Sequence, residues 1–310
     1  MITNYIKQTE QDQFQVVDDP RPGCWIHVDM ATNQDITTIA QLINIDVADL
    51  IDCIDRFEIP RLETFDDVAI VITRYPSKTT TSTDIGLYTT TFAMVLSKDY
   101  FITICTEKSS LVKNVVNRKS DLLTSQKTRL MVLFLGKITQ EYTVNIKLIR
   151  SNVLHQEKDL GQIDSDDINA MTIYEENLNQ YLSALVPLRS VFDQISIGKI
   201  SALIEEDQDL IEGLVHAIRQ SEDLCKINMR SLARLRNSYQ IIFTNQLNKT
   251  IKLLTALTII LNIPTMIASI YGMNISLPGQ DLANAWLFIL ILIFGGTVAG
   301  FVYFRRNKWL

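Results

Sequence analysis

The sequence predicts an α+β cytosolic domain, built from a mixed sheet with flanking helices, that leads into one very long helix and then into a two-helix transmembrane hairpin. Three observations support this prediction: strand-like runs occur only before residue 107, a helical pattern continues from about residue 125, and two long uncharged stretches close the chain. Of the 310 residues, 47% are hydrophobic and 21% charged. This composition excludes a disordered protein, because enough apolar surface is present to offset the entropy of ordering.

The cytosolic α/β and helical domain is expected over residues 1–200. Its strands come first and its longer helices later, which predicts one mixed domain rather than separate ones. Strand patterns cover 24–28, 68–74, 87–96 and 100–106, and helical patterns cover about 36–43, 110–116, 125–157 and 166–194.

The last helix is expected to run from about residue 201 to residue 271. No proline lies between Pro187 and Pro264, and the only glycines between them are Gly198 and Gly213. Such a helix is roughly 105 Å long at about 1.5 Å per residue, and only about 30 Å of it fits in the hydrocarbon core of a bilayer. Residues 201–250 are therefore expected to form a cytosolic stalk. A lone helix of this length would be poorly supported, which predicts packing against further copies of the chain.

The two uncharged stretches predict transmembrane helices over 251–272 and 285–304, joined by an external loop over 273–284. Each is long enough to span a bilayer, which takes roughly 20 residues. Basic residues lie only outside the hairpin, at Lys249 and Lys252 and in the basic tail 305–310. By the positive-inside rule both ends are then cytoplasmic. The alternative is a pair of buried core helices in a soluble protein.

The net charge of −6 is unevenly distributed along the chain. From residue 245 onward, five basic residues and one acidic residue, Asp281, give +4, so residues 1–244 carry −10. A nucleic-acid-binding protein normally has a basic surface in its soluble part, so the acidic domain argues against nucleic acid as a partner.

The first transmembrane helix has a polar stripe. At about 100° per residue, the side chains of residues 251, 254, 258, 262, 265 and 269 fall within roughly 40° of one direction. Asn262 is informative because an amide at membrane depth is costly without water or a polar partner. Hydrogen bonding between helices is one interpretation, and the better one for Thr255 alone. For the whole stripe we favour a water-filled pathway lined by Asn248, Ile251, Leu254, Thr258, Asn262, Thr265 and Ser269, with Ile251 and Leu254 as an apolar constriction.

No enzyme motif is present. The sequence has no GxSxG, Walker A or GxGxxG pattern, which argues against covalent catalysis and ATP-driven pumping. The four cysteines lack CxxC spacing and the three histidines are scattered, so a zinc site of the thiolate or imidazole kind has no support. We expect no organic cofactor.

The first span ends in Tyr271-Gly272-Met273-Asn274, and here the chain resembles the CorA family of divalent metal transporters. A YGMN tetrapeptide that closes the first of two C-terminal helices identifies that family. The resemblance extends to segments on both sides of this motif. They are Asn245-Gln246-Leu247-Asn248, Lys252-Leu253-Leu254-Thr255, the basic end Lys308-Trp309-Leu310 and, upstream, Asp52 with Pro60-Arg61-Leu62-Glu63.

The resemblance implies a homopentameric channel in the plasma membrane, with the first span around a central pore and the second outside it. Gly272, Met273 and Asn274 would form the selectivity filter for hydrated Mg²⁺. The ion keeps its waters, and neutral groups of the filter would hydrogen-bond to those waters. The turn also occurs in related Zn²⁺, Co²⁺ and Ni²⁺ transporters, so the ion stays open. A membrane-anchored cytosolic metal sensor without ion flux is the alternative from another class.

The resemblance also implies regulation by intracellular Mg²⁺ bound between subunits. Asp52 matches an aspartate of the family that pairs with a stalk carboxylate of the next subunit, and Asp209 or Glu212 is the expected partner. Ile51 stands where the family often has a second acid, so we expect either a weaker site or one that uses Asp55 instead. An ordinary solvated acidic face is the alternative for the stalk residues.

Overall fold

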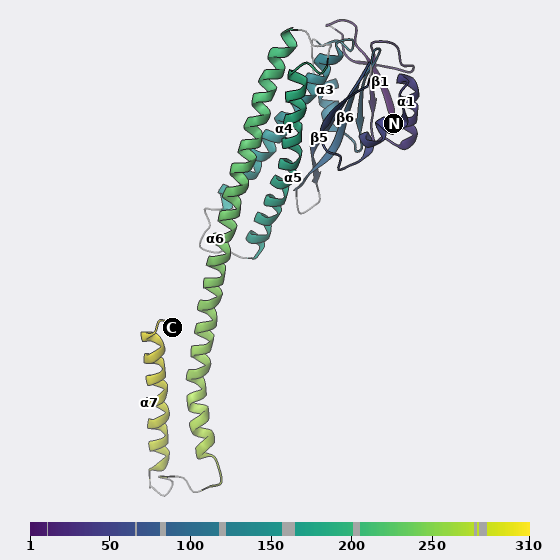
Figure 1. Cartoon of the computed structure of the whole chain (residues 1–310). Helices are drawn as coiled ribbons and strands as arrows, with labels where there is room; N and C mark the ends of the chain where they lie inside the picture. The colour runs from purple at the N-terminus through teal and green to yellow at the C-terminus, as the bar shows by residue number, and fades with distance from the viewer. Residues whose placement is uncertain are drawn as a thin grey trace. The chain divides into compact units, whose positions relative to one another are not determined.

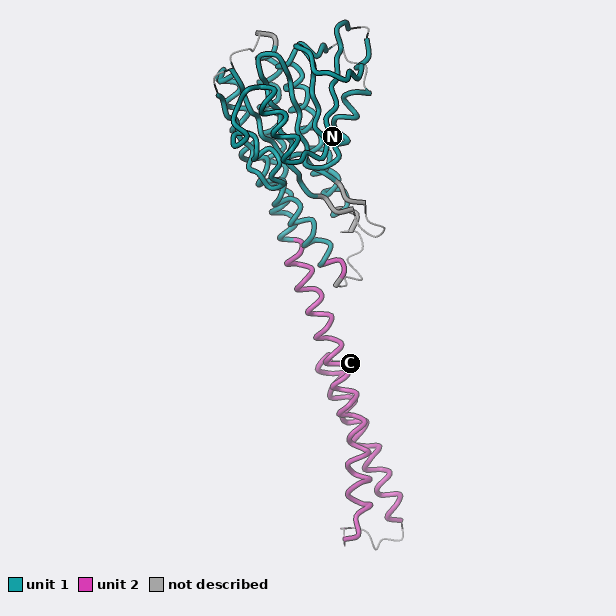
Figure 2. The backbone as a smooth tube through the Cα atoms, turned by 90° about the vertical axis from the view of Figure 1, so that its right-hand side faces the viewer, with its two compact units in different colours: residues 1–160, 169–234 teal, residues 161–168, 235–310 magenta. Residues whose placement is uncertain are grey.

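The computed structural model describes residues 1–10, 12–65, 67–80, 85–117, 122–156, 165–200, 205–275, 278 and 284–310. The chain divides into two compact units, one of residues 1–160 with 169–234 and the other of residues 161–168 with 235–310 (Figure 2). Helix α6 (Glu205–Tyr271) is continuous over 67 residues and contributes to both units.

The first unit contains one seven-stranded sheet (Figure 1). The strand order is β2-β1-β3-β7-β6-β5-β4, and only the β3–β7 pair is parallel. The strands are β1 (Ile2–Ile6), β2 (Gln15–Val17), β3 (Trp25–Val28), β4 (Arg61–Phe65), β5 (Val68–Thr80), β6 (Ile85–Leu96) and β7 (Phe101–Cys105).

One face of the sheet is covered by α1 (Asn33–Ile43), α2 (Val47–Leu50) and the 3₁₀ helix η1 (Ile51–Ile54). Thr32 and Asp35 form a capping box at the start of α1, which satisfies backbone N–H groups that a helix start leaves open. The apolar side of these helices, including Ile36, Ile39 and Leu50, packs on inward-facing strand residues and forms the main core.

The other face is covered by α4 (Lys127–Gln156), and α5 (Ser165–Ser196) and α6 pack beyond it (Figure 1). Phe134 of α4 lies against Trp25 and Phe92, with ring centroids 5.4 Å apart in both pairs. Tyr142 and Tyr181 join α4 to α5 in an edge-to-face pair at 5.2 Å. The short helix α3 (Ser110–Val116) follows β7.

The second unit contains the C-terminal part of α6 and helix α7 (Ala285–Arg306). Ile263 of α6 contacts Gly296 and Gly300 of α7, and Ala256 and Ile260 of α6 cluster with Phe304. Both helices are long and apolar enough to cross a membrane, and the most apolar windows are only 11% and 6% buried. This low burial argues against the soluble-core alternative, because a core helix is covered by protein.

The sequence predicted the main elements correctly. The strands β3, β5, β6 and β7 and the helices α1, α3, α4, α5, α6 and α7 all lie where expected, within a few residues at most ends. The strands β1, β2 and β4 and the helical pair α2–η1 were not predicted. Of the expected external loop 273–284, the structure describes residues 273–275, 278 and 284, so Asp281 lies outside the described residues.

Candidate functional site: a polar helix face and two groups of carboxylates

The polar stripe of α6 is exposed along its whole length. Ile251 is 51% and Leu254 65% exposed, and the remaining residues are exposed as well. Within the second unit no described side chain covers this face. The stripe residues that the sequence singled out are Asn248, Ile251, Leu254, Thr258, Asn262, Thr265 and Ser269.

The stripe points away from α7. The face of α6 that packs on α7 is formed by Ala256, Ile260 and Ile263. At about 100° per residue its centre lies about 165° from the centre of the stripe over residues 251–269. This polar face has no partner among the described residues of the second unit, and within a bilayer it requires either water or another polar surface.

The threonine hydroxyls of α6 donate to the helix itself. Thr258 Oγ1 donates to the Leu254 carbonyl at 2.8 Å, and Thr265 Oγ1 donates to the Leu261 carbonyl at 3.1 Å. A hydroxyl has one hydrogen and two acceptor lone pairs. With the hydrogen already used, these oxygens present only acceptors to the space beside the helix, which suits the outward-pointing hydrogens of water around a cation.

The Gly272-Met273-Asn274 turn follows the last residue of α6 directly. The Gly272 N–H donates to the Ala268 carbonyl at 2.9 Å, and the Met273 N–H donates to the Ile270 carbonyl at 3.2 Å. A Cβ at Gly272 would lie 3.2 Å from the Ala268 oxygen, so close backbone approach favours glycine here. Asn274 is exposed and Met273 is 52% exposed, which leaves the amide available to a solute at the end of the stripe.

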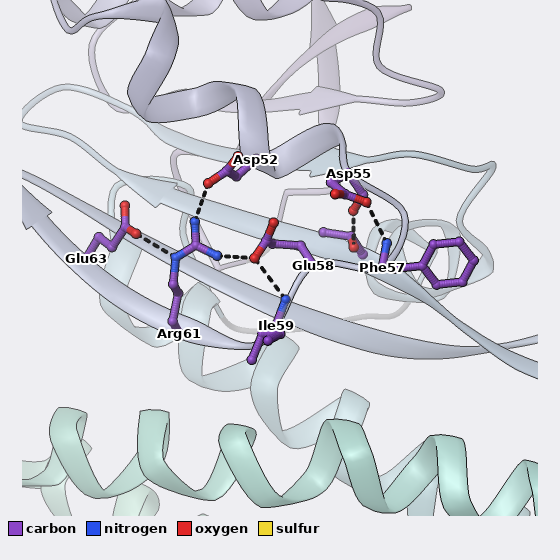
Figure 3. A network of polar contacts seen from close by, with 8 residues as sticks. Asp52, Asp55, Phe57, Glu58, Ile59, Arg61 and Glu63 are labelled. Atoms are coloured by element: carbon purple, nitrogen blue, oxygen red, sulfur yellow. Dashed lines mark hydrogen bonds and ion pairs between the residues drawn. The ribbon is translucent and has the colours of Figure 1, made fainter.

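Asp52 lies in η1 and is bound to Arg61 of β4 (Figure 3). Its Oδ2 accepts from Arg61 Nη2 at 2.6 Å. The same guanidinium donates through Nη1 to Glu58 and through Nε to Glu63. Burial opposes the charge, but hydrogen bonding to Glu63 and the neighbouring carboxylates raise the pKa of Arg61 above its ordinary value. Asp52 nevertheless remains 49% exposed, so one side of its carboxylate faces solvent.

The acidic residues at the start of α6 fall into two groups. Asp207 and Glu222 are buried and paired, Asp207 with Arg129 at 3.0 Å and Glu222 with Arg189 at 2.9 Å, so both tie α6 to neighbouring helices. Asp209 and Glu212, by contrast, are exposed. Beside them a largely apolar pocket of about 550 Å³ opens between α4 and α6, lined by Leu133, Leu210, Leu214 and other residues.

A single chain does not bring Asp52 together with Asp209 or Glu212. Asp52 lies on the face of the sheet covered by η1, whereas α6 packs beyond α4 on the other face (Figure 1). Among the described residues no three His, Cys, Asp or Glu side chains are grouped to hold a metal ion. The carboxylates are oxygen donors of the kind Mg²⁺ prefers, but within one chain the two groups stay apart.

Two features of these sites were missed in the sequence. The first is the set of ion pairs that Arg61 makes with Asp52, Glu58 and Glu63. Only the spacing of Arg61 and Glu63 gave a local signal, because residues two apart on a strand lie on the same face. Gly296 and Gly300 form a GxxxG pattern, which is typical of close helix contacts in membranes and could have been recognised.

Comparison with known proteins agrees with these features. A family model described as CorA-like Mg²⁺ transporter protein matches residues 22–306. The cobalt/magnesium transport protein CorA of Methanocaldococcus jannaschii is 24% identical over 301 residues, covering 92% of this chain and 91% of that protein. The magnesium transport protein CorA of Helicobacter pylori strain J99 is 30% identical over 170 residues, covering 53% of this chain and 50% of that protein.

Solved structures share the fold over nearly the whole chain. The complete structure of the M. jannaschii CorA magnesium transporter matches with a TM-score of 0.75 at 19% identity, covering 100% of this chain and 99% of that one. The full-length CmaX protein matches with a TM-score of 0.71 at 15% identity, covering 99% and 97%. Sheet, long helix and apolar hairpin thus recur together in these structures.

Proposed function

The chain belongs to the CorA-like Mg²⁺ transporter family, and we propose that it is a channel-like system for Mg²⁺ uptake across the cytoplasmic membrane. The membrane potential drives entry, because moving a divalent ion inward is worth about 4.6 kcal/mol per 100 mV. The observation that carries the proposal is the exposed polar stripe of α6, which faces away from α7 and ends at the Gly272-Met273-Asn274 turn.

The pore is formed by several copies of the chain, five by the family resemblance. Each copy contributes the stripe of α6 to a central water-filled pathway, and α7 lies outside with its apolar surface toward lipid. Phe294 and Trp286 on α7 are 73% and 63% exposed, as expected of side chains that meet acyl chains rather than water. Burial of the stripe around a shared aqueous pathway removes its polar groups from contact with lipid.

Ion selection takes place at the turn, where a ring of Asn274 amides and nearby backbone carbonyls accepts hydrogen bonds from the hydration shell of the ion. Mg²⁺ dehydrates reluctantly, so neutral groups that bind its waters suit it. The acceptor-only hydroxyls of Thr258 and Thr265 continue this lining along the pathway. At the cytoplasmic end Ile251 and Leu254 form the apolar constriction, which closes by losing its water.

Regulation occurs at the boundary between copies, where Asp52 of one copy and Asp209 or Glu212 of the next bind Mg²⁺ from the cytoplasm. Bound metal holds the closed state, and its loss allows opening. Exposed apolar residues next to both groups support a shared interface. Phe57 and Ile59 beside Asp52 are 69% and 63% exposed, and Leu210 beside Asp209 is 55% exposed.

The test is Mg²⁺ entry into liposomes that contain the purified full chain. We expect saturable entry that increases with an inside-negative potential, and a large loss of entry in Asn274→Ala. Asn307→Ala is the matched control, because Asn307 follows the C-terminal end of α7, and it should transport like the wild type. If Asn274→Ala also transports like the wild type, the filter assignment is wrong.

The ion is tested in the same liposomes. One relative's printed name pairs cobalt with magnesium, and the CmaX relative is named a divalent cation transporter, so competition by Co²⁺, Ni²⁺ and Zn²⁺ belongs in the assay. A dominant Zn²⁺ flux would reassign the substrate. A sensor without flux predicts instead that Thr258→Leu combined with Asn262→Leu changes nothing and that no ion enters.

A further inference from the structure

Each nitrogen of the Arg61 guanidinium holds a different carboxylate (Figure 3). Nη2 lies 2.6 Å from Asp52 Oδ2 and Nε 2.5 Å from Glu63 Oε1, while Nη1 pairs with Glu58. The three acids differ in exposure: Asp52 is 49%, Glu63 32% and Glu58 19% exposed. Asp52 is therefore the most accessible of the three carboxylates to an ion in solvent or to an ion bound by a neighbouring copy.

The cluster retains excess negative charge. Three carboxylates and one guanidinium sum to −2, and among the described residues Arg61 is the one cation within 4.0 Å of these acids. Arg56 is directed elsewhere: it pairs with Glu107 at 3.1 Å and lies 5.1 Å from the centre of the Tyr88 ring. An uncompensated charge of this size favours a divalent ion over a monovalent one.

We propose that Arg61 is a tethered counter-cation that competes with Mg²⁺ for Asp52 and so sets the Mg²⁺ concentration at which the regulatory interface forms. The inference rests on the regulatory role proposed above for Asp52. When Mg²⁺ binds Asp52, the guanidinium leaves that carboxylate but keeps Glu58 and Glu63. No partly buried charge is left without a partner, which keeps the exchange reversible.

This exchange also contributes selectivity. A monovalent cation offers Asp52 no more charge than the guanidinium, which binds with a directed, charge-assisted hydrogen bond. Mg²⁺ carries twice the charge and can coordinate a carboxylate oxygen directly. Arg61 therefore keeps Asp52 occupied in a cytoplasm rich in monovalent ions and gives way to a divalent one.

The experiment measures Mg²⁺ binding by the detergent-solubilised full chain, by titration calorimetry and by protection of α6 from protease as Mg²⁺ increases. Arg61→Gln should reduce the half-saturating Mg²⁺ concentration about fivefold, the size expected for loss of one partly exposed ion pair. Arg61→Lys keeps the charge, but its single ammonium group lacks the planar fork of the guanidinium. Its half-saturating Mg²⁺ concentration, called the half-point below, should therefore lie between those of the wild type and Arg61→Gln. Arg56→Gln removes the same charge nearby and should shift the half-point less than twofold.

The outcomes separate this inference from the proposed function. If Asp52→Asn shifts the half-point but Arg61→Gln leaves it unchanged or raises it, Arg61 does not compete and only the present inference fails. An equal shift in Arg56→Gln would also overturn it, because general electrostatics would then account for the effect. If Asp52→Asn binds like the wild type, the regulatory site itself is wrong. If Arg61→Gln fails to fold, Arg61→Lys is measured instead, and a half-point that is not below that of the wild type overturns the inference.

Discussion

Ile263 of α6 lies against Gly300 of α7, and a Cβ at Gly300 would be 3.0 Å from the Ile263 Cδ1 atom. A methyl group could be tolerated by a small movement of that side chain, but a larger side chain could not. The GxxxG pair Gly296 and Gly300 thus lets α7 approach α6 closely on the side opposite the polar stripe.

Gly300→Leu should therefore destabilise the hairpin by about 1–3 kcal/mol, the usual cost of overpacking. Gly295→Leu is the matched control, because nothing lies within 4 Å of a Cβ at that position. Both changes replace glycine by leucine in one apolar helix, so helix propensity is the same. Thermal unfolding of the full chain in detergent should give a lower Tm for Gly300→Leu alone. Equal Tm values would contradict the packing.

Glu222 should stabilise the helical part of the first unit, although its neighbour Asp223 should not. Glu222 is 2% exposed and binds Arg189 and Lys226, whereas Asp223 is exposed. Glu222→Gln leaves two cations without their shared carboxylate. Because both are about 40% exposed, solvent reduces the loss to about 2 kcal/mol. Chemical denaturation of the full chain should show this loss for Glu222→Gln and none for Asp223→Asn; a similar loss in both would exclude the ion pairs as its cause.

The adjacent acids Glu222 and Asp223 illustrate what the sequence could and could not predict. Both are acidic and adjacent on one helix, but their environments depend on where α5 packs on α6, and no local pattern carries that information. The polar stripe was predictable because helix geometry alone determines which residues share a face. The pairing of Arg61 with Asp52 was not, because it joins η1 to β4 and no helix or strand periodicity relates the two residues.

The strands show the same division. β5 and β6 were predicted because each contains an apolar run that is buried between two neighbouring strands. β2 and β4 are short edge strands of three and five residues, too short to show a clear pattern, and β1 is only partly buried. The extent of α6 was clear from the absence of proline between Pro187 and Pro264, although the helix begins at Glu205 rather than at residue 201.

His27 should make the first unit less stable in mild acid. Burial lowers the pKa of His27 to about 4, although Asp29 opposes the shift. Trp25 Nε1 donates to Thr103 Oγ1 at 2.9 Å, and the same hydroxyl lies 3.0 Å from His27 Nδ1, to which it can donate only while that nitrogen is unprotonated. As the pH falls below about 6.5, His27 takes up a proton in the unfolded chain but not in the folded one. The free energy of unfolding therefore decreases progressively between pH 6.5 and about pH 4.

Across that interval the loss approaches about 3 kcal/mol. His27→Gln, which cannot take up the proton, should therefore show a smaller decrease in Tm between pH 7 and pH 5 than the wild type. His216→Gln is the control, because His216 is exposed on α6. An unchanged pH dependence in His27→Gln would mean that other groups cause the acid destabilisation.

Thr258→Val tests whether the stripe of α6 acts through acceptor oxygens. Thr258 Oγ1 donates to the Leu254 carbonyl at 2.8 Å, so only its lone pairs are left for a solute beside the helix. Valine keeps the branched shape but removes the acceptor from every copy. We expect Mg²⁺ entry into liposomes to fall about fivefold, the effect of one lost hydrogen bond of ordinary strength.

Thr297→Val is the matched control on α7. Thr297 Oγ1 makes the same kind of bond, to the Ile293 carbonyl at 2.8 Å, but it lies on α7, the helix that we propose to be outside the pore. Its loss should leave Mg²⁺ entry unchanged. Equal losses in the two variants would mean that the hydroxyl matters for helix geometry rather than for the ion, since both threonines bond their own helix in the same way. Loss in Thr258→Val alone would locate the effect on the face of α6 that points away from α7.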